Sequence, residues 1–199
     1  MATNVAVEDC TVANNQSTGV YLYMSSAICR CCAHNNTGTG IMTSQGSIIQ
    51  ECISSNNTTH GIYASAGTII KDNNVRDNNT DGILAGNSCV ITGNVAYNNG
   101  SFNIESGDCC TIIGNTSYSS PTYGIYASNG SVVQNNTSYF NDSGMRVFSG
   151  STVIGNTAWS NTNYGIYCST ECLVDNNAMR NNSLDNLYAP GCTLGLNQE

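Results

Sequence analysis

A two-residue step, usually glycine followed by an aliphatic residue, recurs along the whole chain at an almost constant interval. The step is found at Gly19-Val20, Gly40-Ile41, Gly61-Ile62, Gly82-Ile83, Asn103-Ile104, Gly124-Ile125, Gly144-Met145, Gly165-Ile166 and Asn186-Leu187. Successive copies lie 21 residues apart (40 − 19 = 21), except for one interval of 20 (144 − 124 = 20). A fixed period of this size is typical of a solenoid, in which each repeat forms one coil.

The repeat also bounds the domain organisation. No Pro/Ser-rich linker or run of charges interrupts it, so residues 1–199 are expected to form one domain of about nine coils. The repeat begins within the first few residues, which is also compatible with a fragment of a longer chain. A solenoid whose ends carry no cap exposes unpaired strand edges, so head-to-tail assembly of copies is a further expectation.

Two aliphatic columns define the expected strands. With the first residue of each step as position 1, position 2 is aliphatic in all nine coils, and position 10 is Ile or Val throughout. Position 10 holds Val7, Ile28, Ile49, Ile70, Ile91, Ile112, Val133, Val153 and Val174. One such residue per coil does not match the helical period of 3.6 residues and favours short strands stacked in register. Positions 4 and 8 hold mostly small residues, and Thr193 is expected to occupy position 8 of the last coil.

Two polar columns are expected at corners. Position 13 is Cys10, Cys31, Cys52, Asn73, Asn94, Asn115, Asn136, Asn156 and Asn177, and position 18 is asparagine in every coil except at Ser120. Asparagine tolerates the left-handed backbone of a sharp turn, and stacked asparagine side chains can hydrogen-bond from coil to coil. The glycine of each step, such as Gly124, is likewise expected to turn a corner.

The pattern Gly-Ile-x7-(Ile/Val)-x2-Asn-(Thr/Val)-x-Tyr-x-Asn is clearest from Gly82 to Tyr164. It resembles the right-handed parallel β-helix repeat of pectin-lyase-like proteins, and is similar to their carbohydrate-binding and sugar-hydrolase (NosD-like) group. The resemblance covers Val5 to Leu196 and implies an all-β, single-stranded parallel β-helix, here with no obvious capping helix. That superfamily includes lyases, hydrolases, adhesins, viral fibres and inert spacers, so the resemblance implies a fold rather than an activity.

Charge excludes some partners. The chain carries 5 Lys and Arg against 13 Asp and Glu, for a net charge of −8. Nucleic acid and anionic membranes bind clusters of basic residues, so neither is expected as a partner. No apolar run is long enough to span a bilayer, and the N-terminus has no secretory signal pattern. An extracellular, virion-surface or cell-surface location is favoured, and no cofactor is expected.

The eleven cysteines have two readings. Cys10, Cys31 and Cys52 fall in one column, about 4.8 Å apart in adjacent coils, a spacing compatible with disulfides and with a buried row of free thiols. Cys29 with Cys31-Cys32 superficially resembles a metal knuckle, but alternate strand residues point to opposite faces. We therefore expect no metal site and interpret the cysteines mainly as core residues.

Catalytic residues are sparse. The resemblance implies that an enzyme of this fold would act on an outward face, and position 3 is expected to line one. Glu105 and Arg146 are the ionisable residues of that column, and Asp81 and Asp108 lie near Glu105 in the repeat. Glu105, Asp81 and Arg146 form the candidate catalytic set for acid–base cleavage, but scattered surface charge is the favoured interpretation. His60 precedes Asp81 by one coil and could pair with it, although a plain surface contact is favoured. The Gly-Asp-Asp and Gly-His-Gly motifs of polygalacturonases and the Arg-x-x-Arg pattern of pectate lyases are absent.

Aromatic columns are the stronger lead. Four aromatic residues occupy position 16 in consecutive coils, and others recur at position 3; the candidate ligand-binding residues are Tyr97, Tyr118, Tyr139, Trp159, Tyr126 and Tyr167. Contiguous exposed aromatics often mark a surface for sugars or proteins, but tyrosine also favours strands for packing reasons alone. The sequence thus predicts a non-catalytic structural or binding solenoid, with a glycan as its candidate partner. The alternative is a polysaccharide lyase or glycoside hydrolase.

Overall fold

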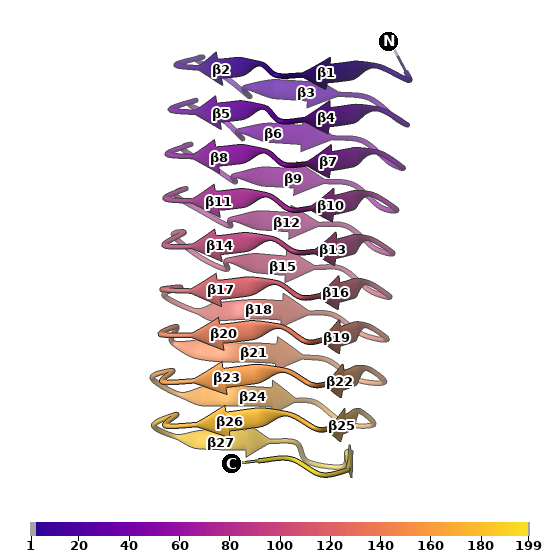
Figure 1. Cartoon of the computed structure of the whole chain (residues 1–199), viewed down its shortest axis with the longest axis vertical. Coiled ribbons are helices and arrows are strands. Elements are labelled where there is room, and N and C mark those ends of the chain that lie inside the picture. The colour runs from indigo at the N-terminus through magenta and orange to yellow at the C-terminus, as the bar shows by residue number, and fades with distance from the viewer. Residues whose placement is uncertain (1–2, 199) are drawn as a thin grey trace.

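The computed structural model describes residues 3–198, which form a solenoid of 28 short strands in three parallel sheets. Each coil adds one strand to each sheet, and the coils stack along one axis from the N-terminal to the C-terminal end (Figure 1). No helix occurs between residues 3 and 198. The predicted all-β parallel solenoid of about nine coils is confirmed.

The three sheets are named A, B and C. Sheet A contains β1 (Ala6–Glu8), β4 (Ala27–Cys29), β7 (Ile48–Gln50), β10 (Ile69–Lys71), β13 (Val90–Thr92), β16 (Thr111–Ile113), β19 (Val132–Gln134), β22 (Thr152–Ile154), β25 (Leu173–Asp175) and β28 (Thr193–Leu194). Sheet B contains β2 (Thr11–Ala13), β5 (Cys32–His34), β8 (Ile53–Ser55), β11 (Asn74–Arg76), β14 (Val95–Tyr97), β17 (Thr116–Tyr118), β20 (Thr137–Tyr139), β23 (Thr157–Trp159) and β26 (Ala178–Arg180). Sheet C contains β3 (Val20–Leu22), β6 (Ile41–Thr43), β9 (Ile62–Ala64), β12 (Ile83–Ala85), β15 (Ile104–Ser106), β18 (Tyr123–Ala127), β21 (Ser143–Val147), β24 (Tyr164–Cys168) and β27 (Asp185–Tyr188).

The two aliphatic columns form the core. In sheet A the middle residue of each strand points inward, so that Ile70 pairs with Ile49 and Ile91 and all three are fully buried. In sheet C position 2 is buried in the same way, as at Ile83 and Ile104. Burying one such side chain stabilises the fold by about 1.5–3 kcal/mol, and every coil repeats the contribution.

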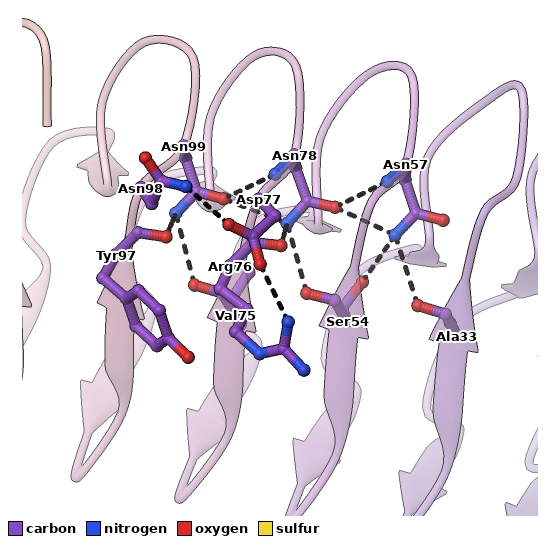
Figure 2. A network of polar contacts seen from close by, with 10 residues as sticks. All are labelled: Ala33, Ser54, Asn57, Val75, Arg76, Asp77, Asn78, Tyr97, Asn98 and Asn99. Atoms are coloured by element: carbon purple, nitrogen blue, oxygen red, sulfur yellow. Dashed lines mark hydrogen bonds and ion pairs between the residues drawn. The ribbon is translucent and has the colours of Figure 1, made fainter. Parts of the chain in front are cut away.

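The corner asparagines form the predicted hydrogen-bonded columns. We call position 13 the first column and position 18 the second column. In the second column the Nδ2 of Asn57 donates to Asn78 Oδ1 (2.9 Å), and the Nδ2 of Asn78 donates to Asn99 Oδ1 (3.0 Å), as Figure 2 shows. The backbone N–H groups of Asn57 and Asn78 donate to the same oxygens. Each column therefore satisfies buried amides of successive coils.

The left-handed backbone lies one residue before the place that the sequence predicted. Asp72 and Asp77, which precede Asn73 and Asn78, both have φ of 56°, and Gly114 before Asn115 has φ of 66°. The left-handed residue turns the chain so that the next side chain points into the core. The exposed residue thus takes the strained conformation, and the buried asparagine provides the hydrogen bonds.

The glycines of the repeated step also have another role than expected. Gly124 lies inside β18 rather than at a corner. A Cβ atom there would collide with Ser138 Oγ and would lie 2.6 Å from Asn141 Nδ2. Glycine is needed at position 1 of a coil whose position 18 is asparagine, because that asparagine packs directly against the backbone.

Two further sequence assignments are changed or settled. Thr193 pairs with Leu173, so Cys192, not Thr193, stacks on Cys172 at position 8. The last coil is thus one residue shorter before β28 than the constant period implied. All eleven cysteines are free thiols, and most of them are buried. Burial raises the pKa of the Cys52 thiol to about 12, as expected for an inert core residue.

Candidate functional site

The outer face of sheet C brings a carboxylate, an aromatic ring and a guanidinium into one row. Glu105 of β15 pairs in register with Tyr126 of β18, which pairs with Arg146 of β21. Positions 2 and 4 of each strand point into the core, so position 3 between them points outward. All three side chains are half-buried. Adjacent coils lie about 4.8 Å apart, so the three groups span about 10 Å along the axis.

Tyr126 is surrounded by aromatic rings that are inclined to it. Its centroid lies 5.1 Å from that of Phe102 (41° between planes), 6.1 Å from that of Tyr123 (59°) and 5.1 Å from that of Phe148 (55°). Inclined and edge-to-face contacts of this kind are favourable arrangements of aromatic pairs. Tyr126 is therefore the centre of a cluster of four aromatic rings on this face.

The guanidinium of Arg146 is held by aromatic rings rather than by a carboxylate. Its Cζ atom lies 4.7 Å from the centroid of Phe148 and 3.6 Å from that of Tyr167. Cation–π contacts of this kind orient a guanidinium while leaving its N–H groups able to donate. No described carboxylate lies within 4.0 Å of Arg146.

His60 and Asp81, for which the sequence favoured a plain surface contact, form a close pair at the edge of the same face. The Nδ1 of His60 lies 3.0 Å from Asp81 Oδ2, and the amide of Phe102 donates to Asp81 Oδ1 (3.1 Å). Asp81 is only 6% exposed. Burial alone would raise the pKa of this carboxyl, but the hydrogen bonds from His60 and Phe102 outweigh it and lower the pKa. Asp81 is therefore a fixed, buried carboxylate.

Glu105 is shifted in the opposite direction. Burial raises the pKa of Glu105, the negative charge of Asp81 raises it further, and His60 acts against both. Burial and the charge of Glu105 also raise the pKa of Tyr126, while Arg146 opposes this shift. Opposite pKa shifts of two neighbouring carboxyl groups are frequent at functional sites.

The aromatic row of sheet B is arranged differently. The rings of Tyr97 and Tyr118 are nearly parallel (6°) with centroids 4.6 Å apart, Tyr118 and Tyr139 are 5.1 Å apart at 13°, and Tyr139 and Trp159 are 4.9 Å apart at 8°. Phe140 packs edge-on against the last two. The inner ring faces cover one another, so this row presents edges and hydroxyl groups to the outside.

The structure therefore divides the candidate residues between two faces. Glu105, Arg146 and Asp81 lie together with Tyr126 and Tyr167 on or beside sheet C, whereas the other four aromatics lie on sheet B. The sequence did not single out Phe148, which contacts both Tyr126 and Arg146. Its place two residues after Arg146 in the repeat is the only signal that could have identified it.

Two absences complete the description. Among residues 3–198, no group of three or more His, Cys, Asp and Glu side chains is placed to hold a metal ion. In the same range there is also no helix of the length and apolarity that a bilayer crossing requires.

Comparison with known proteins identifies the family. The family described as "Right handed beta helix region" matches residues 1–117, more than half of the chain. The chain belongs to this family. The right-handed parallel β-helix implied by the sequence resemblance is thereby confirmed. A search of curated protein sequences finds no match.

Solved structures share the fold at low sequence identity. The A-module of the Azotobacter vinelandii mannuronan C-5 epimerase AlgE6 has a TM-score of 0.86 and 15% identity, covering 98% of this chain and 64% of that one. The periplasmic alginate epimerase AlgG has a TM-score of 0.67 and 15% identity (92% and 60%). The Dettilon tailspike protein has a TM-score of 0.54 and 18% identity (87% and 43%). This chain thus spans less than two thirds of the length of each of these three structures.

Proposed function

We propose that the protein binds a polysaccharide along the outer face of sheet C, with Tyr126 at the centre of the site. The row from Glu105 through Tyr126 to Arg146 carries this proposal. An aromatic ring packs against the apolar face of a sugar, and a carboxylate and a guanidinium on either side accept and donate hydrogen bonds with its hydroxyl groups.

A neutral polysaccharide fits the site best. Arg146 is the only basic residue of position 3, and the chain as a whole has a net charge of −8. A strongly anionic polymer would be repelled over most of the surface. The outward row continues over successive coils, so it suits an extended chain lying along the solenoid axis.

The structural neighbours support a polysaccharide as the ligand, although not the choice of a neutral one. Two of them are epimerases named for mannuronan and alginate, one of which is described as periplasmic, and a third is a viral tailspike. A location outside the cytoplasm or on a particle surface is part of the same proposal. Head-to-tail assembly stays a prediction, and sedimentation at increasing protein concentration tests it.

The binding test compares the same substitution on two faces. A neutral glycan selected on an array is titrated calorimetrically into the wild type, Tyr126→Ala, Arg146→Gln and Tyr118→Ala. We expect about a tenfold loss of affinity for each of the two sheet C variants, since a lost ring contact or charged hydrogen bond is worth about 1.4 kcal/mol, and no loss for Tyr118→Ala. Thermal unfolding of each variant checks its folding. If Tyr118→Ala loses affinity while Tyr126→Ala does not, the sheet B row is the site.

The same site favours a second candidate function, the cleavage of the bound polysaccharide. Its basis is the raised pKa of Glu105 beside the buried Asp81–His60 pair. A carboxyl group with a raised pKa keeps its proton at pH values where an ordinary glutamate has lost it, which a general acid requires. Glu105 would then protonate the leaving oxygen as the glycosidic C–O bond breaks, a water molecule would add to the anomeric carbon, and the proton that this water releases would return to Glu105. Arg146 would hold the substrate.

The cleavage test has a distinct pH signature. Reducing ends are measured on the polysaccharide that the protein binds, and we expect the rate to fall as pH rises through the raised pKa of Glu105. The raised pKa also makes stability depend on pH. The free energy of unfolding falls as pH rises from the pKa of Glu105 in the unfolded chain to its higher pKa in the folded protein, because the folded state disfavours the ionised carboxylate. Glu105→Gln removes this dependence. A wild type that binds without cleaving, or a Glu105→Gln variant that cleaves at the full rate, rejects this candidate.

A further inference from the structure

One corner of the solenoid departs from the pattern that the other coils follow. At the corner where sheet B leads into sheet C, each second-column asparagine is followed by a residue whose backbone N–H donates a hydrogen bond. The acceptor is the backbone carbonyl of the second-column asparagine in the preceding coil. Examples are Thr58 to Asn36 (2.9 Å), Gly100 to Asn78 (2.8 Å) and Thr162 to Asn141 (3.0 Å). Pro121 occupies this position in its coil and has no N–H to donate.

The proline leaves one backbone carbonyl of this corner without a protein donor. Asn99, which Pro121 would otherwise contact, is 2% exposed, and no donor within residues 3–198 reaches its backbone carbonyl. The next bond is also altered, because Thr122 donates to Ser120 Oγ and Ser120 Oγ donates to the carbonyl of Ser101 (2.7 Å). A carbonyl without a protein donor remains an acceptor that a ligand hydroxyl can pair with.

The same corner is hollowed. A depression of about 610 Å³, open to solvent, is lined by the turn residues of three successive coils, including Asp77, Asn79, Asn98, Gly100, Ser119 and Pro121. Asn99 and its neighbour Asn78 belong to the same lining. A Cβ atom at residue 100 would collide with the carbonyl oxygen of Asn79, so glycine there keeps side-chain atoms out of the hollow.

The polar groups of the hollow carry little net charge. Asp77 Oδ2 lies 2.8 Å from Arg76 Nη1, and Asp77 Oδ1 accepts from Asn98 Nδ2 (2.6 Å), as Figure 2 shows. The other side chains, Asn79, Asn98 and Ser119, are neutral groups that both donate and accept. A cation would find one carboxylate that is already paired, whereas a neutral molecule with several hydroxyl groups matches the lining.

We propose that this corner hollow binds a single neutral pyranose unit, with one sugar hydroxyl donating to the carbonyl of Asn99. The site uses turn residues between sheets B and C, not the outward row of Glu105, Tyr126 and Arg146. It does not depend on the function proposed for sheet C. The sugar is either a free monosaccharide or a terminal or branching unit of a glycan.

The test restores the missing N–H. Amide chemical shifts of the ¹⁵N-labelled protein are followed by NMR during titration with glucose, galactose, mannose and N-acetylglucosamine. We expect at least one sugar to shift the amides of Gly100 and Ser119. In Pro121→Ala the new N–H can donate to Asn99, so we expect this variant to lose those shifts and to unfold at a higher temperature. Thr162→Ala, at the equivalent position of another coil, keeps its N–H and is the matched control.

Each outcome bears on the proposal. Shifts that disappear in Pro121→Ala but persist in Tyr126→Ala and Thr162→Ala support the corner site independently of sheet C. Absence of shifts at Gly100 and Ser119 with all four sugars overturns it, whatever glycan the sheet C face binds. Shifts that persist unchanged in Pro121→Ala overturn the role of the Asn99 carbonyl, and shifts induced by calcium chloride but by no sugar overturn the ligand class.

Discussion

The two asparagine columns make the same kind of hydrogen bond, but the second column tolerates another residue in one coil and the first column, from Asn73 onward, does not. The first column runs without interruption from Asn73 to Asn177 and continues to Asn197. The second column has Ser120 where every other coil has asparagine. There the side chain of Asn103, from the glycine position of the same coil, accepts hydrogen bonds from the N and Nδ2 of Asn99 and thus fills the gap.

The width of the corner explains this difference. Only two residues join the strands of sheets A and B, as Gly114 and Asn115 do between β16 and β17, so no other side chain can reach the first column. The corner between sheets B and C is longer. There Asn103 replaces the usual glycine and Ser120 the usual asparagine, so an amide oxygen still accepts from Asn99, but from another position of the coil. The wide corner can therefore vary in sequence, and it is also where the hollow beside Pro121 lies.

The largest expected effect is in the narrow corner. In Asn115→Ala, the N and Nδ2 atoms of Asn94 lose the Oδ1 atom that accepts their hydrogen bonds. The variant also lacks the Nδ2 group that donates to Ile91 O, Ile113 O and Asn136 Oδ1. We expect a loss of about 4 kcal/mol in the free energy of unfolding, measured by urea denaturation, because several buried groups lose their partners together.

Asn74→Ala is the matched control for this variant. Asn74 lies on the outward side of β11, and its Oδ1 is buried without a hydrogen-bond partner within residues 3–198. Removing this unsatisfied group breaks no hydrogen bond of the Oδ1 atom, so we expect the free energy of unfolding of Asn74→Ala to stay unchanged or to rise. Equal losses for the two variants would show that the first column does not have the structural role assigned to it.

An intermediate effect is expected at the exchange in the wide corner. Asn103→Gly restores the consensus glycine but leaves Asn99 without its acceptor, and we expect it to cost about 2 kcal/mol. Ser120→Asn alone should also destabilise, because two side chains would compete for one space. The double variant, Asn103→Gly with Ser120→Asn, restores the ordinary second column and should recover most of the lost stability. A double-mutant cycle should therefore show a strong favourable coupling between the two positions. Losses that simply add would contradict the interpretation that Asn103 and Ser120 compensate for each other.

The smallest effect is expected where the first column contains cysteine. Cys31 N donates to Cys52 Sγ at 3.4 Å, whereas the column asparagines accept at 2.9–3.0 Å. Cys52→Asn can donate to Ile28 O and Gln50 O, which the thiol now contacts, so we expect a gain of about 1 kcal/mol. Cys52→Ala is the comparison and should lose stability. A Cys52→Asn variant less stable than Cys52→Ala would show that this end of the column is too narrow for an amide.

The repeat alone predicted much of the candidate site. Placing Glu105, Tyr126 and Arg146 at position 3 predicted that they share an outward face, and the register confirms this arrangement. The repeat could not predict that the rings of sheet B lie parallel while those of sheet C are inclined, because ring orientation depends on side-chain packing between neighbouring coils. Their roles in binding remain a proposal.

The sequence by itself determined the coil, its period, the core columns and the hydrogen-bonded corners, because each of these repeats once per coil and depends on residue type. Tertiary structure alone decided what happens where the repeat is broken. Asn103, Ser120 and Pro121 read as three unrelated deviations along the chain, and only the stacking of coils shows that the first two compensate for each other. The same stacking shows that the third leaves the carbonyl of Asn99 without a described donor. Deviations have no period, so their consequences depend on which atoms the neighbouring coils bring within reach.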